Sequence, residues 1–403
     1  MIARAIVLRL LKRIREGSLT VVDAGGRHEF GSGAPHATLD VHDRPTYAAL
    51  LHGSRGLAES YADGLWDTPD LTALIRVAAR NAKLLDEPRR RATPLREPYQ
   101  RARSALSRNT PRRSRTDIAA HYDLGNELFS LMLDPTMMYS SARFTRPGMT
   151  LEQASLAKLE LTCERLDLGP DDHVLEIGTG WGGFALHAAA TRGCRVTTTT
   201  ISREQRAYAQ TRVRDAGLAD RVTVLEQDYR DLRGRYDKLL SLEMVEAVGW
   251  KDFGTFFERC AELLEPDGVM LLQAITIDDR AYAVERASRS FIRTHIFPNG
   301  CLPSLEVIAR CTARRTDLTM VSMEDFGLDY AETLRRWRAN LERHAGRLEA
   351  LGYDERFLRM WRMYLCYCEA GFAERRIGVA QTLFAKPAWR PPSAVSDSVR
   401  RAA

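Results

Sequence analysis

Hydrophobic and polar positions change their period at several points along the chain, and each change marks an expected element. Between residues 17 and 42 apolar and polar residues alternate around glycine-containing turns, which predicts a β-hairpin or a small sheet. From residue 45 to about residue 85 apolar residues recur at helical spacing, with an interruption near residues 63–66. A further helix is expected to begin after Asp67-Thr68-Pro69, because this composition is typical of a helix start.

The pattern changes again after Pro170, where short apolar runs alternate with helical stretches. This alternation predicts an α/β fold with a mostly parallel, doubly wound sheet that helices cover on both faces. The expected strands are His173–Ile177, Arg195–Thr200, Val222–Glu226, Tyr236–Leu242 and Val269–Ile275, the last after a turn at Pro266-Asp267-Gly268. The expected helices between them are Gly183–Ala190, Arg203–Ala216 and Phe253–Leu264.

The segments on either side of these strands are expected to be mainly helical. A helix is predicted from Thr116 to about residue 132, and residues 278–345 are predicted to be mostly helical around a loop at 296–304. An amphipathic helix from Asp354 and a last strand at Ala380–Ala385 complete the pattern.

Segment 87–115 has a composition unlike the rest of the chain. It contains ten arginines, four prolines and two acids, so its local charge is +8 although the whole chain has a formal charge of +6. This predicts a linker between an N-terminal domain at 1–86 and a larger domain at 116–403. A patch for anionic lipid headgroups is an equal alternative. Nucleic-acid binding is disfavoured, because Tyr99 is the only aromatic residue in the segment.

The seven cysteines are scattered and include no CxxC pair, so the sequence predicts neither a metal site nor a disulfide framework, and a reducing cytoplasm is expected. The apolar N-terminus is interrupted by Arg4 and Arg9, and no run approaches the roughly 18 apolar residues of a membrane span. The first helix is therefore expected to be amphipathic. It either packs on its own domain or touches a membrane surface.

A glycine-rich loop follows the first strand of the larger domain. Gly178, Gly180, Trp181 and Gly182 stand between that strand and a helix, a pattern that suits a dinucleotide or S-adenosylmethionine. A dinucleotide fold favours an acid at the end of the second strand, but this strand ends at Thr200. The remaining features of the loop edge favour the methyl donor: Glu176 for its ammonium group, and Asp228 and Tyr229 for its adenine.

Several longer strings carry a family resemblance. They are HYDLGNELFSLMLD (121–134), MMYSSARF (137–144), VLEIGTGWGG (174–183), TISREQ (200–205), QDYRDL (227–232), IFPNGCLPS (296–304) and DYAETL (329–334), with LAESYADGLWD (57–67) and AQTLFAK (380–386) outside them. In this order they resemble the cyclopropane-fatty-acid synthase family of S-adenosylmethionine-dependent methyltransferases. The resemblance covers nearly the whole chain. It implies a Rossmann-like class I methyltransferase fold with a seven-stranded sheet and a smaller, lipid-engaging α+β domain at 1–86.

The family methylates a cis double bond of an acyl chain, usually within a membrane phospholipid. The resemblance implies a helical lipid-pocket insertion at about 278–345. It also implies donor contacts at Tyr139, Ser140, the Gly178–Gly183 loop, Thr200, Gln205, Asp228 and Tyr229. The base that removes a proton is expected to be a bound bicarbonate. By resemblance, it would be held by Ser141, Glu246, Gln273, the backbone of Ile275, and Tyr330.

Four positions in this cluster depart from the family pattern. Ser141 replaces a cysteine, Gln273 and Ala247 replace histidines, and Glu243 stands where glycine is common. Gln273 can donate a hydrogen bond to an anion but cannot take its proton. The combination resembles a subgroup linked to mid-chain methylation. A cyclopropane, a methylene and a methyl-branched chain therefore all remain open as products.

The expected enzyme acts on unsaturated phospholipid acyl chains at the inner face of the membrane, as a cytoplasmic, peripherally associated protein without a nucleic-acid partner. A homodimer is a further expectation from the family. Substitution of Glu246 by glutamine is expected to remove most turnover and to keep donor affinity. Two alternatives stay open: a catalytically altered lipid-binding homologue, and an NAD-dependent Rossmann oxidoreductase.

Overall fold

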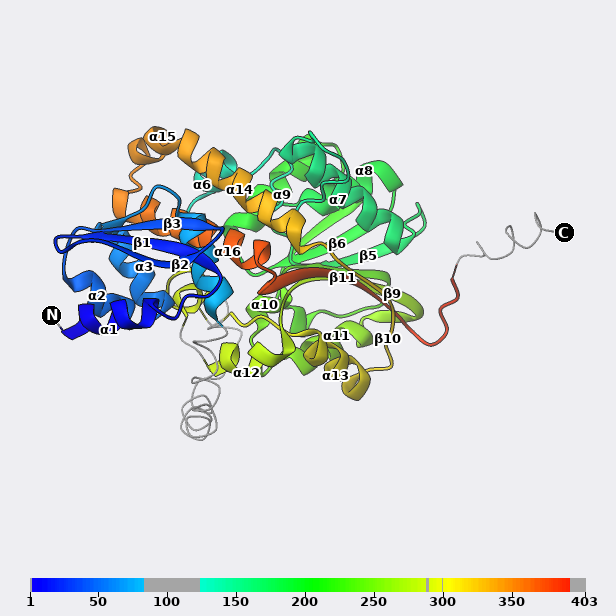
Figure 1. Ribbon diagram of the computed structural model, residues 1–403. Helices are drawn as coiled ribbons and strands as arrows, with labels where there is room; N and C mark the ends of the chain where they lie inside the picture. Colours follow the sequence, from blue (N-terminus) through cyan, green and yellow to red (C-terminus); the bar gives the residue numbers. More distant parts are fainter. Residues whose placement is uncertain (1, 83–123, 288–289, 299, 392–403) are drawn as a thin grey trace.

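The computed structural model describes residues 2–82, 124–287, 290–298 and 300–391, which form two β-sheets and the helices around them (Figure 1). The arginine-rich segment at 87–115 and the expected helix start at Thr116 lie outside the described residues. Among the described residues, no helix combines the length and apolar character that crossing a bilayer requires.

The N-terminal unit contains a four-stranded sheet in the order β2-β1-β3-β4. Strands β1 (Gly17–Asp23) and β2 (Gly26–Ser32) form the predicted antiparallel hairpin; β3 (His36–Val41) pairs parallel to β1, and β4 (Trp66–Asp67) pairs antiparallel to β3. Alternate residues of β1, Leu19 and Val21, are buried, as period-two patterning requires. The helices of this unit are α1 (Ile2–Leu11), α2 (Pro45–Leu50), α3 (Ser54–Ala62) and a helix that includes residues 71–82.

The second sheet has seven strands in the order β10-β11-β9-β8-β5-β6-β7. Its parallel strands are β5 (His173–Ile177), β6 (Arg195–Thr200), β7 (Val222–Glu226), β8 (Tyr236–Leu242) and β9 (Leu264–Ile277); β10 (Thr319–Asp325) and β11 (Ile377–Ala385) are antiparallel. The predicted mostly parallel, doubly wound sheet is confirmed. The chain order reverses between β5 and β8, and ligands of such sheets bind at the carboxyl ends of the strands beside this switch.

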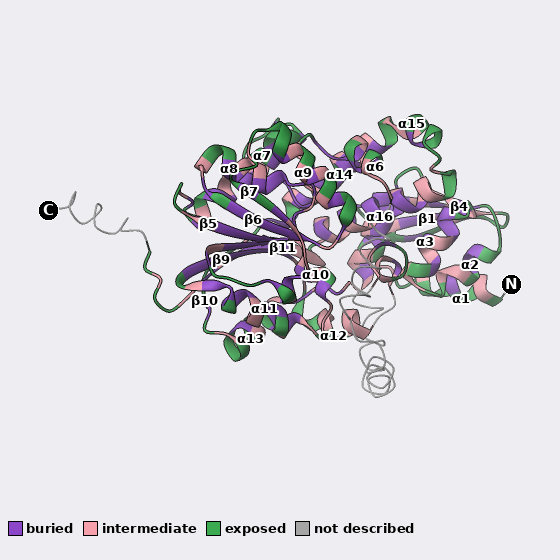
Figure 2. Cartoon of the chain, turned by 180° about the vertical axis from the view of Figure 1, so that it is seen from behind, coloured by how far each residue is buried: buried purple, intermediate pink, exposed green. Residues whose placement is uncertain are grey.

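Helices cover both faces of the large sheet, and its strands are largely buried (Figures 1 and 2). One face carries α7 (Leu151–Leu166), α8 (Gly183–Arg192) and α9 (Arg203–Asp215); the other carries α11 (Phe253–Glu262) and α13 (Leu305–Arg315). The remaining elements are α6 (Asn126–Met132), the 3-10 turn Tyr229–Asp231, α10 (Val245–Val248), α12 (Asp279–Ala287), the π-helical turn Ile292–Ile296, α14 (Gly327–Arg343), α15 (Ala345–Ala350) and α16 (Glu355–Ala373).

Helix α16 joins the two units, because it packs against α3 of the N-terminal unit and against α14. Just after α16, Glu374 accepts hydrogen bonds from Arg76 Nε at 2.6 Å and from Arg80 Nε at 2.7 Å. Arg359 in α16 donates to the carbonyl oxygens of Tyr61 and Trp66. These bonds hold the N-terminal unit against α16 and the residue that follows it.

The structure differs from the sequence-based prediction at four elements. The helix predicted from Thr116 to about residue 132 does not run through residues 124–125, where Gly125 has φ of 89°, so α6 begins at Asn126. Strand β10 lies within 278–345, where helix was predicted; it is an exposed edge strand whose side chains show little apolar alternation. Helix α7 was not predicted, because its buried face includes Ser155, Lys158 and Thr162. Strand β9 begins at Leu264, before the expected turn at Pro266-Asp267-Gly268. The turn residues lie within the strand as an irregularity in its pairing with β8.

Candidate functional site

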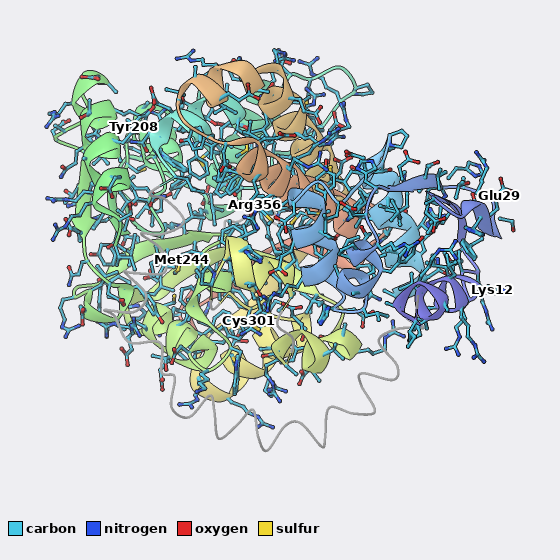
Figure 3. The ribbon with its side chains drawn as sticks, turned by 90° about the vertical axis from the view of Figure 1, so that its left-hand side faces the viewer. Lys12, Glu29, Tyr208, Met244, Cys301 and Arg356 are labelled. Carbon is cyan, nitrogen blue, oxygen red and sulfur yellow. The ribbon has the colours of Figure 1, made fainter. Side chains whose placement is uncertain are left out.

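A cavity of about 1770 Å³ begins at the carboxyl edge of the large sheet and extends to the N-terminal unit. Gly178, Thr200 and Asp228 line it at the sheet edge, whereas Leu39 and Leu74 line it beside the small sheet. Figure 3 labels two further lining residues from the middle of the chain, Met244 and Cys301. One continuous space therefore connects a polar strand edge with an apolar region, an arrangement that suits a ligand with a long hydrocarbon part.

The glycine loop has left-handed backbone conformations that explain its residues. Gly178 has φ of 109°, and a Cβ there would come within 3.2 Å of the Met244 side chain. Gly180 has φ of 51° with open space beside it, and both residues line the cavity. Gly182 does not line the cavity; a Cβ there would lie 3.2 Å from Cβ of Ala209 in α9, so this glycine allows two helices to pack closely.

Two buried ionisable groups lie behind the loop. Glu176 is 2% exposed and accepts a hydrogen bond from Thr198 Oγ1 at 2.6 Å; burial raises its pKa to about 8, against the hydrogen bond and the nearby Lys158 charge. Lys158 is fully buried and donates from Nζ to Ser140 Oγ at 2.8 Å. Burial lowers the pKa of Lys158 to about 8, opposed by Glu243, Asp134 and Glu176. Sequence reasoning missed Lys158, because a lysine in a helix ordinarily faces solvent.

Two predicted donor contacts follow the second strand of the large domain. Thr200 Oγ1 donates to Gln205 Oε1 at 2.9 Å, and both residues are buried and line the cavity. Because Oε1 of Gln205 accepts this bond, its amide is oriented by Thr200. The pair can therefore present fixed polar groups to a ribose.

The third strand ends at the other predicted pair, Asp228 and Tyr229, which also line the cavity. The Asp228 carboxylate accepts hydrogen bonds from the backbone N–H of Arg230 at 3.0 Å and from its Nε and Nη2 at 2.8 Å. The Tyr229 ring lies edge-on to Phe256, with the centroids 5.5 Å apart. Arg230 therefore fixes the carboxylate beside an aromatic ring, as an adenine site requires.

Aromatic rings surround the middle of the cavity. The hydroxyl groups of Tyr139 and Tyr364 lie 2.8 Å apart, and the Tyr139 ring lies 5.3 Å from that of Trp337. The Tyr330 ring stacks on Phe372 at 4.4 Å. Tyr139, Tyr330, Tyr364 and Phe372 all line the cavity, so ring faces are available to a developing positive charge.

The carboxylate of Glu243 is the point on which three predicted site residues converge. Its Oε1 accepts hydrogen bonds from the backbone N–H of Ser141 at 2.9 Å and from Gln273 Nε2 at 2.6 Å. Its Oε2 accepts from the hydroxyl of Tyr330 at 2.6 Å. The amide of Gln273 is oriented by Gln381, whose Nε2 donates to Gln273 Oε1 at 2.9 Å.

Glu246 forms the second carboxylate of the site. Its Oε1 accepts a hydrogen bond from the backbone N–H of Ile275, and its Oε2 is buried with no hydrogen-bond partner among the described residues. Burial and the nearby charge of Glu243 raise the pKa of Glu246 to about 8. The resemblance assigned five residues to one anion site. In the structure three of them donate to the carboxylate of Glu243, and the backbone of a fourth, Ile275, donates to the fifth, Glu246.

The predicted bicarbonate does not fit this arrangement. Ser141, Gln273 and Tyr330 direct their donors at Glu243, and Ile275 directs its N–H at Glu246. A further anion would have to compete with the two glutamates for these donors, and it would lie against the Glu243 carboxylate, whose negative charge repels it.

The fold and site define the class of protein, and comparisons with solved structures agree. The cyclopropane synthase MmaA2 from Mycobacterium tuberculosis superposes with a TM-score of 0.63 at 32% identity, over 68% of this chain and 98% of that chain. Mycolic acid cyclopropane synthase CmaA1, complexed with SAH and CTAB, superposes with a TM-score of 0.64 at 32% identity, with the same coverage. The large domain has the Rossmann-like class I methyltransferase fold.

Sequence comparison gives the family. Residues 109–382 match the family described as mycolic acid cyclopropane synthetase. Tuberculostearic acid methyltransferase UfaA1 of Mycobacterium tuberculosis is 37% identical over 94% of this chain and 90% of its own length. Cyclopropane-fatty-acyl-phospholipid synthase of Escherichia coli is 38% identical over 88% of this chain and 89% of its own. The chain belongs to the mycolic acid cyclopropane synthetase family, and the resemblance found in its motifs is confirmed.

Proposed function

We propose that the protein transfers a methyl group from S-adenosylmethionine to a cis double bond of an unsaturated acyl chain in a membrane phospholipid. The observation that carries the proposal is the single cavity that joins the glycine loop to an apolar region beside the small sheet. Family membership and the names of the relatives, a fatty acid methyltransferase and a phospholipid cyclopropane synthase among them, support the same reaction.

The donor is held at the strand edge. The part of the glycine loop from Gly178 to Trp181 and the side chain of Glu176 face its methionine part; Thr200 and Gln205 face the ribose, and Asp228 and Tyr229 the adenine. Tyr139 and Ser140 close the site from the segment before α7. Lys158, which holds the Ser140 hydroxyl, is a positioning residue in this arrangement.

The chemistry requires alignment and the absence of water, since an alkene is a poor nucleophile. The donor supplies a methyl group on a sulfonium. Half-buried Tyr139 and buried Tyr330 present aromatic groups where positive charge develops on the acyl chain, and they stabilise it without supplying a reactive anion. A proton must then leave. Depending on the carbon that loses it, the product is a cyclopropane, a methylene-branched chain or a methyl-branched chain that keeps a double bond.

The lipid reaches the site from a membrane surface. Helix α1 packs through buried Val7 and through Arg4, which pairs with Asp23, but leaves Ile2 and Ile6 exposed, at 80% and 43%. Arg9, Lys12 and Arg13, in and just after α1, are exposed, and Lys12 lies at the outer edge of the N-terminal unit (Figure 3). Because α1 also contributes Leu10 and Leu11 to the cavity wall, docking of this helix on an anionic bilayer would bring an acyl chain to the cavity. The homodimer stays a prediction.

Incubation of the protein with methyl-labelled donor and vesicles tests the proposal. Vesicles of unsaturated phospholipid should gain label in the acyl chain, and matched saturated vesicles should not. If the protein binds donor and vesicles but transfers no label, it is a lipid-binding homologue and the proposal is wrong. Nicotinamide cofactor binding without donor binding would favour the oxidoreductase alternative.

A further inference from the structure

The carboxylate of Glu243 already accepts three hydrogen bonds, which is most of what a carboxylate can accept. A carboxylate offers about four lone-pair positions, two on each oxygen. Ser141 and Gln273 occupy both positions on Oε1, whereas Tyr330 occupies one position on Oε2. One position on Oε2 remains, on a side chain that lines the cavity beside the aromatic rings.

The backbone of Glu243 is also unusual. Its φ of 54° lies in the left-handed region, where a residue with a side chain is less stable than glycine by about 1 kcal/mol. Its N–H donates to the carbonyl oxygen of Gln273 at 2.8 Å, so the conformation is fixed by strand β9. A glutamate in a conformation suited to glycine indicates that the carboxylate itself has a role in the cavity.

We propose that Glu243 is the proton acceptor of the reaction, so that this chain carries its own base and does not use a bound bicarbonate. This inference rests on the proposed function. In the step, the alkene electrons form a C–C bond to the donor methyl group while the methyl–sulfur bond breaks, and its electron pair stays on sulfur. A C–H bond of the resulting cation then breaks. Its proton goes to Oε2 of Glu243, and its electron pair closes a ring or forms a double bond.

The charges around the two glutamates favour this assignment. Like charges at short range disfavour double ionisation, so one carboxyl of the pair is protonated. Three donors, two of them side chains, stabilise the charge of Glu243, whereas Glu246 accepts only from backbone N–H groups, those of Ile275 and of Glu246 itself. Burial raises the pKa of Glu243, but these three donors and the charge of buried Lys158 oppose the rise. Glu246 therefore holds the proton at neutral pH, and Glu243 is the ionised base.

The test compares the wild type with Glu243→Gly, measuring acyl methylation in buffer freed of carbon dioxide, with and without added bicarbonate. Glycine suits the φ of this position, and donor binding provides a check that the variant folds. The matched control is Asp167→Gly, which also removes an acid at a positive φ, of 50°, but on the exposed end of α7.

We expect the wild type to be equally active with and without bicarbonate. Glu243→Gly should lose about 100-fold or more of its turnover without added anion, the usual contribution of a general base, and Asp167→Gly should lose little. Bicarbonate should restore part of the lost activity, since the donors of Ser141, Gln273 and Tyr330 become available. Carbon-13 NMR of labelled bicarbonate should detect binding to Glu243→Gly and none to the wild type.

Three results would overturn the inference: a wild type that requires bicarbonate, a Glu243→Gly variant that is fully active without added anion, or a wild type that binds bicarbonate as tightly as the variant. The binding readout does not depend on turnover. A wild type that methylates no lipid contradicts the proposed function, whereas these three results contradict the role of Glu243.

Discussion

Lys158 and Ser140 form a hydrogen bond of 2.8 Å between Nζ and Oγ at a place that solvent does not reach. The lysine is the cation among three carboxylates, of Glu243, Asp134 and Glu176, that act on its pKa. Ser140 lines the cavity directly after Tyr139. One buried ammonium group therefore supports both the charge balance of the site and the segment that lines the cavity at Tyr139 and Ser140.

Replacement of Lys158 by methionine should destabilise the fold by about 3–5 kcal/mol, because it leaves buried carboxylates without their cation. Affinity for the donor should also fall, since Ser140 loses its hydrogen bond. Urea unfolding and donor titration measure the two effects. Lys12→Met, at an exposed lysine, is the control and should change neither. A Lys158→Met variant with wild-type stability would refute this role.

Glu246 should make the protein less stable as the pH rises. Its pKa is raised to about 8 in the folded state from an ordinary value near 4.5, so the folded protein binds a proton that the unfolded chain releases. Stability is therefore lost between about pH 4.5 and pH 8, and this loss is constant above that range. Glu246→Gln remains neutral and should exceed the wild type in stability by about 1–3 kcal/mol at pH 8. The measurement is the free energy of unfolding of both proteins at pH 5 and at pH 8. An equal change between the two pH values in the wild type and in Glu246→Gln would contradict the prediction.

Much of the fold could be predicted from the sequence, because it depends on local periodicity. The strands from His173–Ile177 onward, the glycine loop and the hairpin at 17–42 are each encoded in contiguous residues and are confirmed. Strand β10 could not be found in this way, since it is exposed and its side chains carry little apolar pattern.

The sequence grouped residues that the fold does bring together, but it could not predict the hydrogen bonds between them. Ser141, Gln273, Tyr330 and Glu246 were grouped by resemblance, and Glu243 was noted as an extra carboxylate. Its three donors come from segments more than fifty residues apart, and only the fold brings them within hydrogen-bond distance. Lys158 had no sequence signal, because its burial depends on the packing of α7.

Asp228 should contribute directly to donor affinity. Arg230 holds its carboxylate at the end of β7 beside the Tyr229 ring, where an adenine amine can donate to it. Asp228→Asn should weaken donor binding by about tenfold, equivalent to 1.4 kcal/mol. Asp231→Asn, three residues away and exposed, is the matched control for calorimetric titration. Equal affinities in the two variants would remove Asp228 from the donor site.

Leu50 tests whether the acyl chain extends to the N-terminal unit. It is half-buried and lines the cavity beyond the large sheet. Leu50→Trp fills part of this space, so it should raise KM for long acyl chains more than for short ones while kcat changes little. Leu351→Trp, on an exposed leucine outside the cavity lining, should leave both parameters unchanged. A chain-length dependence identical to that of the wild type would exclude this route.

The most direct test of the account is mass spectrometry of the acyl chains after incubation with donor that carries a fully deuterated methyl group. We expect unsaturated acyl chains of phospholipid to gain one deuterated carbon and saturated chains to gain none. Retention of two deuterium atoms would place proton loss on the transferred carbon, and retention of three would place it on the acyl chain. Unsaturated phospholipid that stays unlabelled, with a protein that binds the donor, would contradict the account.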